Sequence, residues 1–163
     1  MTREFVDGVR ELGRRELSFD LCMRPAELAD GARLVSLCPE TRFILDHCGN
    51  GSVRFSDPER DQWKRGVEAV AKHPNAICKI SGIVASAKGI PWSAEDLAPI
   101  VNHCWEAFGP DRVVFGSDWP VCTLAASLAQ WVDALKQIAA GRSESDRRKL
   151  FHENAVRFYR LAA

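Results

Sequence analysis

The chain has 163 residues, of which 46% are hydrophobic and 27% charged, and both Lys plus Arg and Asp plus Glu number 22. This is the composition of one ordinary globular domain, and a formal net charge of zero without a basic block argues against a nucleic-acid partner. No apolar run approaches the length of a membrane span, and the amino-terminal residues lack the apolar core of a signal peptide. We therefore expect a cytoplasmic protein with no membrane partner.

Helical and strand periodicities alternate along the chain. Four strands are predicted at 17–23, 42–47, 76–81 and 112–116. The predicted helices carry apolar faces at helical spacing, and several begin at Ser or Pro: 5–12, 25–35, 56–73, 93–108, 124–138 and 143–159. Strands separated by helices in this way predict an α/β fold of about four parallel strands with crossover helices. The sheet is either open or part of a (β/α) barrel.

Polar residues stand where three of the strands end. The second strand ends on His47, the third on Ser81, and the fourth on Asp118, just before Trp119. Because the carboxyl ends of parallel strands meet on one side of a sheet, we expect His47, Ser81 and Asp118 to converge on one pocket.

Each candidate also has a purely structural interpretation. Asp118 would cap the next helix, His47 would be a buried imidazole bonded to a backbone carbonyl, and Lys79 would be a strand charge emerging between helices. Side chains alternate along a strand, so a pocket-facing His47 would turn Asp46 and Cys48 away from the pocket.

Six cysteines are spread along the chain, and none forms a Cys-x-x-Cys pair. Most have apolar neighbours of the kind found in strands and helices. We therefore expect small, buried, reduced side chains rather than disulfides or zinc ligands: Cys22, Cys38, Cys48, Cys78, Cys104 and Cys122.

Three segments in order, 43–49, 74–82 and 108–120, closely resemble the amidohydrolase-related family of metal-dependent-hydrolase-like TIM barrels. The resemblance runs from about residue 18 to residue 161 and is greatest to the lactonase branch, typified by L-fuconolactonase and 2-pyrone-4,6-dicarboxylate lactonase. A complete (β/α)₈ barrel needs roughly 250 residues. The resemblance therefore implies the C-terminal half of a barrel, forming one partial domain over residues 1–163.

The resemblance also implies a hydrolase acting on a small-molecule lactone or cyclic ester. The residue matching His47 would polarise the substrate carbonyl or bind metal, and the one matching Asp118 would take a proton from the attacking water. Lys79, Ser81 and Trp119 are the expected substrate contacts.

The sequence departs from the family pattern because it contains no His-x-His pair. One His and one Asp are too few for a zinc site, which takes three or four protein ligands. We therefore assign no metal ligand and no certain cofactor to this chain. A divalent metal such as zinc is expected only in the complete enzyme.

Half a barrel would leave open sheet edges, so we expect self-association or an N-terminal half-barrel partner. The alternative function is a catalytically inactive barrel fragment or partner subunit. A nucleotide-binding α/β module is a weaker third interpretation, because the sequence has no Gly-rich phosphate-binding motif.

Overall fold

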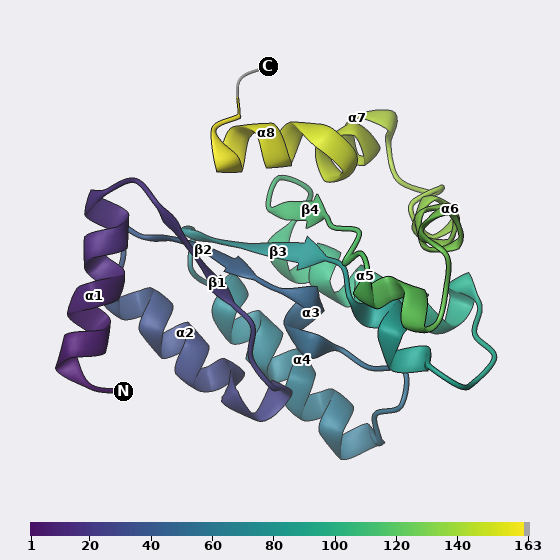
Figure 1. The fold of residues 1–163 in the computed structure, drawn as a ribbon, viewed down its shortest axis with the longest axis horizontal. Coiled ribbons are helices and arrows are strands. Elements are labelled where there is room, and N and C mark those ends of the chain that lie inside the picture. The colour runs from purple at the N-terminus through teal and green to yellow at the C-terminus, as the bar shows by residue number, and fades with distance from the viewer. Residues whose placement is uncertain (162–163) are drawn as a thin grey trace.

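Four parallel strands form a single sheet in the computed structural model, which describes residues 1–161 (Figure 1). The register pairs Ile44 with Ile77 and Lys79 with Val114. The prediction of four parallel strands is confirmed, although every strand is shorter than its predicted range. The strands lie in sequence order: β1 (Ser18–Leu21), β2 (Arg42–Leu45), β3 (Ala76–Ile80) and β4 (Val113–Phe115).

The main core lies between one face of the sheet and the helices packed on it. Phe43, Leu45 and Ile80 project from this face and pack with Trp63 and other buried side chains. Ser-led capping boxes start the helices before and after β3. The helices on this side of Figure 1 are α1 (Arg3–Arg14), α2 (Leu28–Leu37), α4 (Asp57–Ala71) and α5 (Ala94–Phe108).

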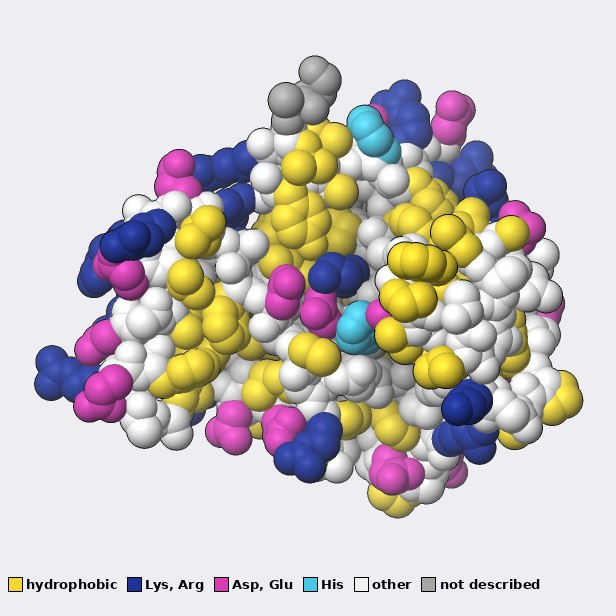
Figure 2. All heavy atoms as spheres, viewed as in Figure 1, with side chains coloured by type: hydrophobic (Ala, Val, Ile, Leu, Met, Phe, Trp, Pro, Cys, Tyr) yellow, Lys and Arg dark blue, Asp and Glu magenta, His cyan; other side chains and the backbone are white. Residues whose placement is uncertain are grey.

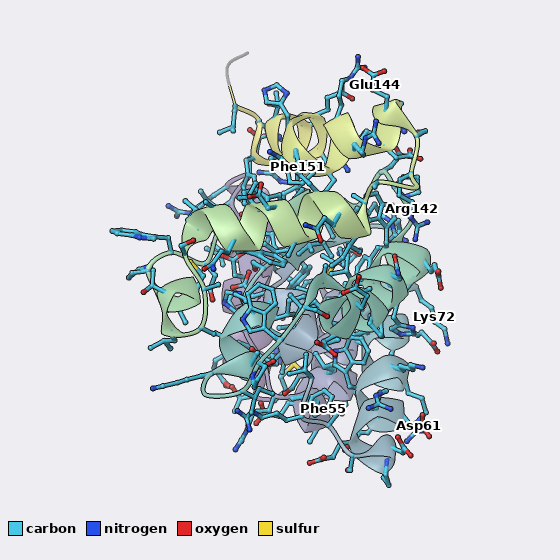
Figure 3. The ribbon with its side chains drawn as sticks, turned by 90° about the vertical axis from the view of Figure 1, so that its right-hand side faces the viewer. Phe55, Asp61, Lys72, Arg142, Glu144 and Phe151 are labelled. Atoms are coloured by element: carbon cyan, nitrogen blue, oxygen red, sulfur yellow. The ribbon has the colours of Figure 1, made fainter. Side chains whose placement is uncertain are left out.

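The opposite face of the sheet is covered over β3 and β4 by the end of the chain (Figure 1). The single last helix expected from the sequence is in fact two α-helices, α7 (Glu144–Arg148) and α8 (Asn154–Tyr159), joined by the π-helical turn η4 (Lys149–Glu153). Phe158 and Tyr159 of α8 pack on a small second core of Ile44, Ile77 and Val114. In Figure 3, Phe151 lies beneath these last helices, and its ring centroid is 5.5 Å from that of Phe115.

Short turns follow the strands on the side where the sequence places the pocket. The stretch after β3, expected to be a loop, contains a short helix, and the helix expected from 124 begins at Leu128, where Ser127 caps it. The short turns are η1 (Pro25–Glu27), α3 (His47–Asn50), η2 (Ile83–Ala87) and η3 (Val121–Leu124). The helix that begins at Leu128 is α6 (Leu128–Ile138).

The edges of the sheet are open. Within residues 1–161, β1 pairs only with β2, and β4 pairs only with β3.

No helix in this part of the chain is long and apolar enough to cross a membrane. Five cysteines are buried as predicted, whereas Cys22, just beyond the end of β1, is exposed and corrects that prediction.

Candidate active site

The strand β2 ends in α3, a single turn with left-handed backbone. The φ angles of His47, Cys48 and Asn50 are all +53°. Left-handed backbone costs about 1–2 kcal/mol per non-glycine residue, so other contacts must hold this turn. The buried indole N–H of Trp63 donates to the Cys48 carbonyl at 2.7 Å, and the Asn50 amide donates to the Met23 carbonyl at 2.8 Å. A helix and the end of a neighbouring strand thus fix where His47 stands.

This turn breaks the side-chain alternation that the sequence predicted. Cys48 does point away from the pocket, into the core, where it is fully buried. Asp46 lies beside His47, and donor atoms of Cys22, Asp46 and His47 all lie within 4.8 Å of one another. His47 belongs to the turn and not to the strand, so strand alternation alone does not describe how Asp46 and His47 lie.

The end of β3 holds the imidazole of His47. The Nδ1 atom of His47 lies 2.9 Å from the Oγ atom of Ser81, which is completely buried. Gly82 follows with a φ of +71°, and a Cβ built there would lie 2.7 Å from the Cβ, Cγ and Nδ1 atoms of His47. Only glycine can occupy this position without moving the ring.

The same hydrogen bond fixes the position of the imidazole proton. A buried hydroxyl needs an acceptor for its proton, and within the described chain the Ser81 hydroxyl bonds to His47 Nδ1 alone. We therefore expect Ser81 to donate to Nδ1, so that a neutral His47 carries its proton on Nε2.

Asp118 meets this imidazole from the end of β4. Its Oδ1 atom lies 3.8 Å from His47 Nε2, and the Asp118 side chain is only 13% exposed. A separation of 3.8 Å is too long for a direct hydrogen bond between the two groups. It leaves both groups free to contact one substrate or water atom placed beside them. Asp118 does not cap a helix, since η3 begins at Val121 after Pro120.

A cavity of about 300 Å³ opens over this pair, within the size range of small-molecule sites. Figure 2 shows a histidine, a basic side chain and acidic side chains gathered at the centre of the face above the sheet. No Lys or Arg of the described residues lines the cavity. The rest of its wall is formed by small or uncharged side chains: Asn50, Gly51, Ser52, Gly82, Ala85, Ser86 and Val121.

The three expected substrate contacts lie outside this lining. Ser81 is buried behind His47, and Trp119 is 67% exposed. Lys79 instead pairs with Asp46, its Nζ atom lying 2.6 Å from Oδ1. Burial alone would lower the pKa of Lys79, but the hydrogen bond and charge of Asp46 outweigh it and raise that pKa. Burial raises the pKa of the neighbouring Asp20 carboxyl.

Cys22, Asp46 and His47 form a group of donors beside the cavity that could hold a metal ion. Two of them are already engaged: the Asp46 carboxylate by the Lys79 ammonium, and His47 Nδ1 by Ser81. A cation at Lys79 Nζ repels a second cation at the same carboxylate. The described residues therefore do not fit a tetrahedral zinc site by themselves.

Sequence reasoning missed Gly82, which lines the cavity, and the ion pair between Asp46 and Lys79 beside it. Asp46 directly precedes His47, but strand alternation assigned it to the other face. Gly82 follows Ser81 where the strand ends, and a glycine at such a point is a signal for close approach of another group.

With this geometry in view, the relatives of the chain are informative. Residues 2–161 match the amidohydrolase family. The chain belongs to that family. It is 31% identical to an L-fucono-1,5-lactonase of Burkholderia multivorans, over 97% of this chain and 56% of that protein. It is 35% identical to protein y4mH of Sinorhizobium fredii, over 98% of this chain and 52% of that protein. The chain thus spans about half the length of the curated relatives it matches.

The solved structures agree with half of a barrel. A zinc-bound amidohydrolase of Burkholderia multivorans superimposes with a TM-score of 0.93 at 29% identity, covering 99% of this chain and 58% of that one. A 2-pyrone-4,6-dicarboxylic acid hydrolase of Pseudomonas putida gives a TM-score of 0.72 at 20% identity, over 93% of this chain and 54% of that one, and supports the fold alone. The expected C-terminal half-barrel fold is confirmed.

The contact between Gly82 and His47 can be isolated with two glycine substitutions. Gly82 and Gly89 both have positive φ, at +71° and +78°, but nothing lies within 4 Å of a Cβ at Gly89. Each change to Ala places a side chain on left-handed backbone, which lowers the free energy of unfolding. Gly82→Ala also forces the His47 ring to move, and this overpacking lowers the free energy of unfolding by about 1–3 kcal/mol more. Urea unfolding measures both losses. Equal losses of stability for the two variants would show that the His47 contact carries no constraint.

Proposed function

We propose that this chain supplies the base and the electrophile of a lactone-hydrolysing enzyme. The observation that carries the proposal is the approach of Asp118 Oδ1 to His47 Nε2 at 3.8 Å over a cavity. A carboxylate and an N–H donor aimed at one point are what acyl transfer to water requires.

In the proposed reaction, Asp118 accepts a proton from water as the water oxygen bonds to the lactone carbonyl carbon. The Nε2–H of His47 donates to the carbonyl oxygen and stabilises the negative charge that develops there. The ring C–O bond then breaks, and the protonated Asp118 returns its proton to the leaving alkoxide, giving the hydroxy acid. Ser81 acts as a positioning residue, because it keeps Nδ1 as an acceptor and the proton on Nε2.

The charge around the pocket favours a neutral, hydroxyl-bearing lactone over a dicarboxylate. No Lys or Arg of the described residues lines the cavity, and the ammonium of Lys79 is already paired with Asp46. A dianionic substrate would meet the carboxylate of Asp118 without a cation to balance it. The sugar-lactonase names among the relatives agree with this choice.

The second candidate, a barrel half that serves as a partner subunit, is favoured by the open edges of the sheet. Unpaired strands such as β1 and β4 pair readily with another chain. Phe5 and Leu17, beside β1, are about half exposed, which adds apolar surface at that edge. Two four-stranded sheets have the strand count of an eight-stranded barrel.

Association can be measured directly. We expect the purified protein to form dimers or larger assemblies at micromolar concentration in sedimentation-velocity runs, because pairing covers both open edges. A well-folded monomer across that concentration range contradicts the partner-subunit proposal and leaves the catalytic proposal untouched.

The catalytic proposal is tested by Asp118→Asn, which keeps the shape of the side chain and removes the base. Hydrolysis of a neutral sugar lactone, followed with a pH indicator, should fall by about two to four powers of ten. Asp133→Asn is the matched control, since Asp133 is exposed on α6, outside the cavity. Full activity of Asp118→Asn would contradict the assignment of the base. An unmodified protein that hydrolyses no lactone would favour the inactive partner subunit.

A further inference from the structure

We infer that Cys48, Cys78 and Cys104 form a binding site for a soft metal ion in the core behind the candidate active site. The three Sγ atoms lie within 4.8 Å of one another, and each residue is completely buried. They come from three separate elements, α3, β3 and α5, that meet beneath the pocket.

The spacing fits three-coordinate binding. Three sulfurs placed about 2.3 Å from a central ion, in a trigonal plane, are about 4 Å apart. The observed limit of 4.8 Å leaves room for an ion after small side-chain rotations. Cysteines that only fill a core need not bring three sulfurs to one point.

The donor set selects the kind of ion. Thiolates prefer soft ions, and no fourth His, Cys, Asp or Glu donor joins this group among the described residues. Zinc in structural sites takes four ligands and is therefore disfavoured here. Three thiolates around a divalent ion leave a net charge of −1, against −2 for a monovalent ion, and burial favours the smaller charge. The site thus suits a soft divalent ion, with Cd(II) as the probe.

Binding exchanges protons for metal. Three S–H bonds break, three metal–sulfur bonds form, and three protons pass to solvent, with no change in oxidation state. The α3 turn, which carries Cys48, is the part of the cluster nearest to solvent, because its neighbours His47 and Asn50 line the cavity.

This cluster is distinct from the group of donors around His47. Cys22, Asp46 and His47 offer one sulfur with oxygen and nitrogen, whereas the buried cluster offers sulfur alone. X-ray absorption at the cadmium edge distinguishes the two sets in the unmodified protein. We expect one Cd(II) per chain, with three sulfur neighbours at one common Cd–S distance.

Variants locate the site independently. Cys104→Ala should weaken Cd(II) binding by more than about tenfold, because it removes a direct ligand, and should reduce the thiolate-to-cadmium absorption band. Cys38→Ala is the matched control, since Cys38 is equally buried but outside the cluster. Cys22→Ser should likewise leave the affinity unchanged. Near-ultraviolet circular dichroism confirms that each variant is folded.

Three results would overturn the inference. These are a folded, reduced protein that retains no Cd(II) after desalting, an absorption spectrum with one sulfur among oxygen and nitrogen neighbours, or binding that is lost in Cys22→Ser and kept in Cys104→Ala. Zinc bound as tightly as cadmium would overturn the choice of a soft ion.

Discussion

The close approach of the His47 ring to the backbone of Gly82 is the constraint on which the site depends. With no side chain at Gly82, the imidazole can lie against the end of β3, where its Nδ1 atom meets the buried hydroxyl of Ser81. That contact orients the other ring nitrogen toward Asp118. A histidine, a hydroxyl and a carboxylate from three strand ends therefore lie next to one another.

Strained backbone is concentrated where the chemistry is proposed. His47 and Asp118 both have a φ of +53°, a conformation that costs free energy for non-glycine residues. The strain at His47 is balanced from outside the turn, chiefly by the buried Trp63 indole that satisfies the Cys48 carbonyl. Contacts in the core thus offset the free-energy cost of the left-handed backbone at the site. The same turn points the Cys48 sulfur into the core and the His47 ring into the pocket.

The sequence predicts the parts of this structure that depend on local pattern. Strand alternation and helix caps identify the four strands and their crossover helices, and parallel topology brings His47, Ser81 and Asp118 to one rim. The conformation of α3 depends on a contact with Trp63, which no local pattern reveals. The cysteine cluster depends on how three distant elements pack, so each cysteine alone is indistinguishable from a core residue. The π-helical turn in the last helix leaves no signal in its apolar spacing.

The proposed function depends on Ser81 holding His47 with its proton on Nε2, facing Asp118. A long-range proton–nitrogen correlation spectrum of the protein, labelled with nitrogen-15 in histidine, reads the tautomer of each imidazole directly. We predict a neutral His47 protonated on Nε2, and a mixture of tautomers once Ser81→Ala removes the donor. A His47 protonated on Nδ1 in the unmodified protein would contradict the account.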